Sequence, residues 1–119
     1  MHPIKTAIAE EEYVFGLHPF RLFCLYHLGL DDDGKASFKN ANQCARILEV
    51  TQEQMNDALT AYRMTASTLL HSNFDLASAQ ADISVAMPDV DLLAIARIHF
   101  NGFLSAKENA RDWDAELEP

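Results

Sequence analysis

The chain has few of the residues that mark flexible linkers, disulfide frameworks or membrane spans. Its 119 residues include only four Gly, four Pro and two Cys. So little Gly and Pro excludes a linker-rich or disordered chain, and a secreted domain that relies on disulfides would carry more Cys. The longest apolar run, Leu22 to Leu30, is interrupted by His27 and Gly29 and is shorter than the roughly 18 residues of a spanning helix.

Basic residues are also scarce. Lys and Arg total 9 against 18 Asp and Glu, which gives a net charge of -9 and excludes a protein that coats nucleic acid non-specifically. The N-terminal stretch MHPIKTAIAEEE has three Glu before any hydrophobic stretch, so it does not match a signal peptide. We therefore predict a cytoplasmic protein with reduced thiols and no membrane segment. What is present, 49% hydrophobic and 23% charged residues, is typical of one globular domain.

The apolar spacing predicts a mostly α-helical fold. Pro3 to Gly16 indicates a first helix, and Pro19 to Leu30 is apolar nearly all round, as expected of a central core helix. The acidic run Asp31–Asp33 then predicts a solvated turn. It does not fit a calcium-binding EF-hand, because Asn40 stands where that loop needs a bidentate Glu.

Two further helices are predicted at Ala41 to Leu48 and Thr51 to Tyr62, with Thr51 and Gln54 forming a capping box. Residues 66–87 leave two alternatives open. The alternation from Ala81 to Val85 favours a short β-hairpin, and a continued helix is the other interpretation.

The C-terminal segment shows the clearest periodicity. Apolar residues recur in a seven-residue repeat from Leu92 to Leu117, a spacing typical of a coiled-coil seam. We expect a domain over residues 1–101 and a long C-terminal helix over residues 89–119. The first half of that helix should pack on its own domain, and the second half should extend towards a partner, making the protein a homodimer. The expected partner contacts on the seam are His99, Phe103 and Trp113.

The stretch Asn40 to Arg63 carries the most specific pattern. A small residue, Ala45, stands where two helices could cross closely, and the apolar positions around it are Cys44, Leu48, Val50, Met55, Ala58 and Leu59. In these positions the stretch resembles the helix-turn-helix of bacterial transcription regulators. With a core helix before it and a hairpin at 66–87 after it, the resemblance implies a winged-helix domain. One departure is Glu49, where the family usually has Gly. A left-handed backbone at a non-Gly residue costs about 1 kcal/mol.

The resemblance implies DNA binding by the second helix. Asn and Gln side chains can read adenine edges, and cations between Gly34 and Leu48, a stretch without any acidic residue, can contact phosphates. The DNA-contacting residues expected on this basis are Gln52, Gln54 and Asn56 for bases, and Lys39, Arg46 and Arg63 for phosphates.

An acidic protein-interaction module on the same scaffold is the alternative, since fold does not dictate function. Glu53 and Asp57 lie on the would-be recognition helix, where phosphates would repel them and a basic protein would attract them. Residues 66–119 add to this charge, with three cations and nine acidic residues.

Catalytic and metal-binding patterns are not found. The four Gly form no phosphate-binding loop, and no nucleophile motif is present. The residues that could bind zinc, Cys24, His27, Cys44 and His71, match no compact zinc spacing, and Cys at apolar positions behaves as a small hydrophobe. We therefore predict no enzymatic activity, no cofactor and no metal.

Overall fold

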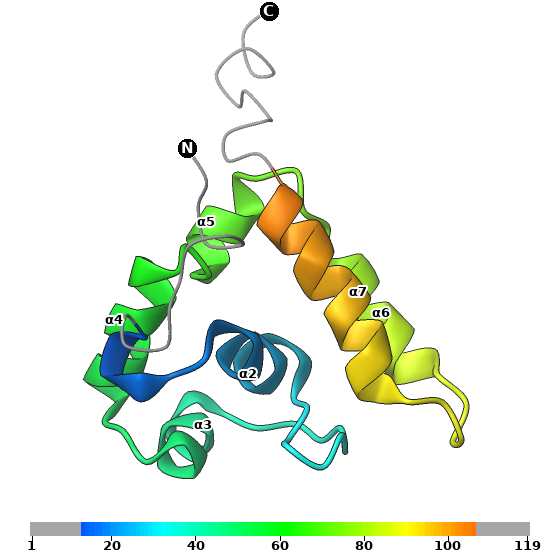
Figure 1. Ribbon diagram of the computed structural model, residues 1–119, viewed down its shortest axis with the longest axis horizontal. Coiled ribbons are helices and arrows are strands. Elements are labelled where there is room, and N and C mark those ends of the chain that lie inside the picture. Colours follow the sequence, from blue (N-terminus) through cyan, green and yellow to red (C-terminus); the bar gives the residue numbers. More distant parts are fainter. Residues whose placement is uncertain (1–12, 107–119) are drawn as a thin grey trace, which may run out of the picture.

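The computed structural model describes residues 13–106, and this part of the chain is mostly helical, as predicted. Figure 1 shows α2 at the centre, with α3 and α4 on one side and the adjacent helices α6 and α7 on the other. Between residues 13 and 106 the β-type pairing is limited to a bridge between Leu30 and Ala36. The helices are η2 (Val14–Gly16), α2 (Pro19–Phe23), η3 (Cys24–Leu28), α3 (Ala41–Leu48), α4 (Gln52–Ala61), α5 (Ala66–Leu70), α6 (Leu76–Val85) and α7 (Leu92–Ser105).

The predicted core helix is α2 with its π-helical continuation η3. It begins at Pro19, whose fixed φ suits the first turn, and the His18 ring accepts a hydrogen bond from the Phe20 amide at 3.0 Å. It ends at Gly29, which is left-handed at φ 68°. A Cβ on Gly29 would lie 2.5 Å from the Ser37 carbonyl oxygen, so only glycine fits this close approach between the helix end and the following loop.

Helices α3 and α4 both begin with a complete capping box. The Thr51 hydroxyl accepts from the Gln54 amide and the Gln54 side chain accepts from the Thr51 amide, both at 3.0 Å, which confirms the predicted box. Asn40 and Gln43 form the same arrangement at the start of α3. Between the helices, Glu49 is left-handed with φ 61° and ψ 40°, the conformation in which glycine is favoured.

The Glu49→Gly substitution should raise the free energy of unfolding by about 0.5–1 kcal/mol, because glycine adopts positive φ without the Cβ clash. Urea denaturation followed by circular dichroism measures this change. Glu49→Ala is the matched control, since it removes the same carboxylate and retains the strain, and it should give no such gain. Equal stabilities of the Gly and Ala variants would contradict this account of the turn.

Of the two alternatives for residues 66–87 the helical one is present and the β-hairpin is not, since this segment forms the helices α5 and α6. Asp75 caps α6 by accepting from the Ser78 amide at 3.0 Å, and Ala79 and Ile83, four residues apart, are both buried. The alternating pattern near Ile83 therefore arises from one buried helical position between exposed neighbours, and the winged-helix order is not present.

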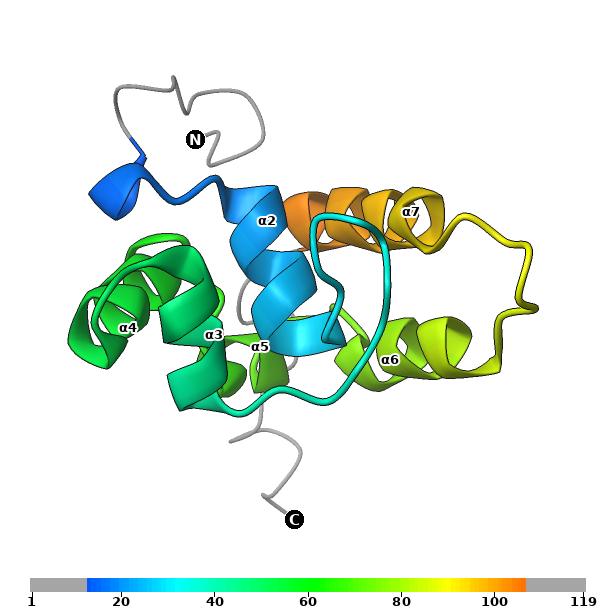
Figure 2. The same ribbon diagram turned by 90° about the horizontal axis from the view of Figure 1, so that it is seen from below.

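Helix α7 packs against α6 and α2, and the two views in Figures 1 and 2 both place α6 and α7 side by side. The centre of the packing is an aromatic cluster. The Phe23 ring centroid lies 5.4 Å from that of Phe100 and 5.8 Å from that of Phe103. Phe103 and Ala96 are buried, so the described part of the seven-residue repeat faces the domain's own core.

Some expectations lie outside the described residues. The predicted first helix falls mostly before residue 13, and what is described of it is the short helix η2. Residues 107–119, including Trp113, carry the second half of the expected C-terminal helix. The homodimer therefore stays a prediction. Between residues 13 and 106, no helix combines the length and the apolar character needed to cross a bilayer.

Candidate functional site

The exposed face of α4 is the surface that the sequence pattern proposes for contact. Met55, Ala58 and Leu59 are buried in the core, and this fixes which side of the helix meets solvent. The exposed residues predicted here as DNA or partner contacts are Gln52, Glu53, Asn56 and Asp57. The structure thus places four of the candidate side chains together on one helix face.

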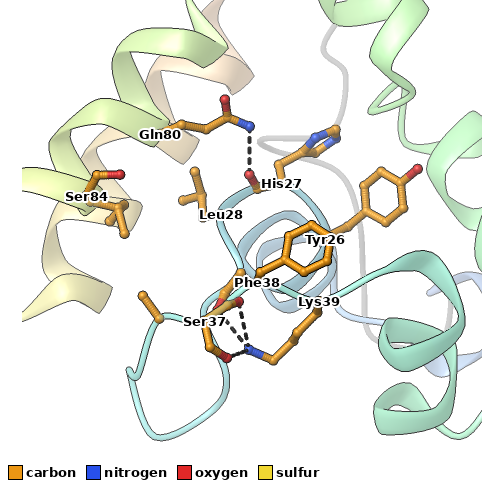
Figure 3. Close-up of a pocket in the computed structure, with 11 residues that line it drawn as sticks. Tyr26, His27, Leu28, Ser37, Phe38, Lys39, Gln80 and Ser84 are labelled. Atoms are coloured by element: carbon orange, nitrogen blue, oxygen red, sulfur yellow. Dashed lines mark hydrogen bonds between the residues drawn. The ribbon is translucent and has the colours of Figure 1, made fainter.

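Lys39 has a different role from the predicted phosphate contact. Its ammonium donates to the Gly29 carbonyl at 2.9 Å, the Ser37 carbonyl at 3.2 Å and the Ser37 hydroxyl at 2.7 Å. An ammonium has three donor hydrogens, so all of them have acceptors within the loop (Figure 3). Lys39 holds the loop between Gly29 and α3 in place.

Gln54 also has a structural role, because its side-chain oxygen accepts a hydrogen bond from the Thr51 amide in the capping box. Gln52 lies near the other helix, with its amide 3.4 Å from the Asn42 side-chain oxygen. Of the three amide side chains expected to read bases, Gln52 and Asn56 are exposed and Gln54 is half-buried.

Arg46 on α3 and Arg63 beyond α4 are exposed. Residues 34–63 carry four cations and three acidic residues, a net charge of +1. Residues 13–33 have a net charge of -2, and residues 64–106 have a net charge of -3. Of these three sections of the described chain, only residues 34–63 are positive, and Lys35 and Lys39 in the loop before α3 supply that charge, because residues 41–61 hold one cation and three acidic residues.

Helix α4 itself is negative. Glu53 and Asp57 are exposed and four residues apart, which places them on the same face of the helix. The helix, residues 52–61, contains neither Lys nor Arg. Its solvent face therefore presents two carboxylates beside two neutral amides.

A second surface was not identified from the sequence. Residues Val85, Met87 and Ile98 are 76%, 67% and 70% exposed at the end of the α6–α7 pair. The expected partner contact His99 lies beside this surface, and its Nε2 is 2.7 Å from the Asp82 carboxylate on α6. The sequence signal was the continuation of apolar residues around α7 beyond its buried seam.

The potential metal ligands are not assembled into a site. Between residues 13 and 106, no group of three or more His, Cys, Asp or Glu side chains could hold a metal ion. Cys24 and Cys44 are free thiols in the core. His27 is buried, with its Nε2 2.6 Å from the Met64 carbonyl oxygen, and burial lowers the pKa of this ring.

A hollow of about 410 Å³ lies beside the C-terminal end of η3, and Figure 3 shows the residues that line it. Gln80 on α6 donates to the His27 carbonyl at 3.0 Å across it, and Phe38 at its edge is 89% exposed. Two of the polar side chains in its lining, Lys39 and Gln80, donate to backbone carbonyls of the chain itself. Comparisons of this chain with family models, with curated proteins and with solved structures give no match.

Proposed function

We propose that this chain is an acidic protein-interaction module built on a helix-turn-helix scaffold, which binds a basic partner through the exposed face of α4. The observation that carries the proposal is the pair of exposed carboxylates, Glu53 and Asp57, on a helix without a cation. In a phosphate-lined groove both carboxylates would be repelled unless they accepted hydrogen bonds from cytosine. Against Lys and Arg of a protein they are attractive, and complementary charge accelerates association.

The roles of Lys39 and Gln54 support the same proposal. Phosphate contacts supply most of the affinity of non-specific DNA binding, and Lys39 has no donor hydrogen left for a phosphate because its ammonium bonds to the loop. Arg46 and Arg63 are then the remaining predicted phosphate contacts. Two cations beside three exposed acidic residues provide little attraction for a polyanion.

DNA binding is the second candidate function, and one observation favours it. Residues 34–63 have a net charge of +1 within a chain of -9, and Gln52 and Asn56 offer exposed amides next to this charge. In this alternative, Arg46 and Arg63 contact phosphates while the two amides contact bases. A dimer would place two such helices on half-sites one helical turn apart.

A titration of a labelled random duplex separates the two functions. At about 50 mM salt phosphate contacts are weakly screened, and we expect no binding by the natural chain up to about 100 µM, the weak end of non-specific affinities. The Glu53→Lys, Asp57→Lys double variant should gain salt-sensitive binding, because four units of charge change on the same face. Micromolar binding by the natural chain that Arg46→Glu abolishes would establish the DNA function instead.

The protein contact is tested by quantitative affinity capture from the cells that make this chain. Proteins captured by the natural chain through α4 should be lost with Glu53→Lys and with Asp57→Lys. Asp33→Lys is the matched control, since it reverses an exposed acidic residue outside α4 and should retain the same proteins. A captured set that is unchanged by both α4 reversals would contradict α4 as the contact surface.

A further inference from the structure

The end of the α6–α7 pair carries an apolar groove that the proposed function does not use. Its volume is about 490 Å³, and its apolar lining comes from Val85 at the end of α6, Met87 and Val90 in the connecting loop, and Ile95 and Ile98 on α7. Soluble monomers rarely expose large contiguous apolar patches, and such patches commonly mark binding sites. Here Val85, Met87 and Ile98 are each more than two-thirds exposed.

Acidic residues outnumber basic ones in residues 76–106, the segment that supplies the lining of this groove. Asp82 lines the groove, Asp89 lies in the connecting loop, and Asp91 caps α7 by accepting from the Leu93 and Ala94 amides. His99 in the lining is already hydrogen-bonded to Asp82. The only Lys or Arg of residues 76–106 is Arg97, and its guanidinium lies 3.7 Å above the Phe20 ring, where α7 packs towards α2.

We propose that this groove binds an amphipathic helix of a partner protein, with apolar side chains along one face and Lys or Arg on the flanks. Apolar side chains on that helix, spaced three and four residues apart, would enter the groove between α6 and α7 in the manner of helix-in-groove recognition. Its flanking cations would meet the carboxylates of Asp82 and Asp89. This surface is distinct from the exposed face of α4, so an experiment can contradict one of the two binding proposals and leave the other intact.

Charge disfavours two occupants that the chain itself could supply. A second copy would bring its own acidic residues and a further net charge of -9 against this one. The segment 107–119 contains two cations and five acidic residues. It also follows the end of α7, whereas Ile95 and Ile98 lie in the first half of that helix. Like charges at an interface select against a partner.

The test uses a fluorescein-labelled model peptide with leucine along one helical face and lysine on the others, titrated with the full chain at near-physiological salt. We expect micromolar binding, measured by fluorescence anisotropy, and a clear weakening when glutamate replaces the lysines. Ile98→Glu should weaken binding about tenfold or more, as loss of a central apolar contact does. This variant also separates the groove from general attraction, because an added negative charge would strengthen binding that was only electrostatic.

Leu70→Glu is the matched control, since Leu70 is an exposed apolar residue on α5 and the same charge is added away from the groove. It should bind the peptide at least as well as the natural chain. Circular dichroism verifies that both variants are folded. Equal peptide affinity of the Ile98→Glu variant and the natural chain would overturn the proposal. A dimer in sedimentation that Ile98→Glu dissociates would also overturn it and assign the groove to a second copy.

Discussion

Phe23→Ala is expected to lower the free energy of unfolding by about 3–5 kcal/mol, the usual cost of removing a large aromatic side chain from a core. Phe23 is fully buried, and its ring contacts Phe74, Phe100 and Phe103 with centroid separations below 6 Å. These rings come from α7 and from the loop before α6, so one cavity would loosen both against α2. Because the free energy of unfolding of a small domain is about 5–15 kcal/mol, the substitution would remove a large part of the stability of this chain. Urea denaturation measures it.

Phe38→Ala is the matched control for this experiment. It removes the same side chain from a position that is 89% exposed, so the change in stability should stay within about 0.5 kcal/mol. A similar loss in both variants would contradict the assignment of Phe23 to the centre of the core.

Acid is expected to destabilise the chain through His27, beginning near pH 6.5. Burial lowers the pKa of His27 below its usual value, although the hydrogen bond to the Met64 carbonyl opposes this. The folded chain therefore resists protonation of this ring, while the unfolded chain takes up the proton below about pH 6.5. The stabilisation is complete above pH 6.5 and is lost as the pH falls towards the pKa of the folded state. The limiting slope for one proton is about 1.4 kcal/mol per pH unit.

Urea denaturation between pH 7.5 and pH 5, at intervals, measures this dependence. His27→Gln keeps an amide donor for the Met64 carbonyl and removes the titrating ring, so its stability should change less with pH over this window. His71→Gln is the control, because His71 is exposed and the variant retains His27. If the His27→Gln variant loses stability with acid as steeply as the natural chain, the buried ring is not the cause.

The helices that the sequence predicted best are those with local end signals. Residues 41–48 match α3, and α4 lies between Thr51, its cap, and Tyr62. Caps and turn residues act within four positions of each other, so a single sequence shows them directly. The left-handed turn expected at Glu49 is present for the same reason.

Long-range packing decided the features that the sequence did not predict. The repeat from Leu92 onward identifies the apolar face of α7, but not that Phe23 and Phe74 would cover Phe103. At 66–87, alternation over five residues is compatible with both a strand and a helix with one buried position. The structural role of Lys39 depends on the loop that returns to the helix end, because its ammonium reaches the Gly29 carbonyl ten residues before it, and no local pattern shows that return.

The two cysteines of the core have a practical consequence for chemical labelling. The thiolate is the reactive form of a thiol, and burial raises the pKa of Cys24 to about 12 and also raises that of Cys44. Maleimide and iodoacetamide reagents should therefore leave both native thiols largely unmodified in the folded chain at neutral pH. A single cysteine introduced at an exposed position such as Val85 would then carry a fluorophore or a crosslinker, without removal of the natural cysteines.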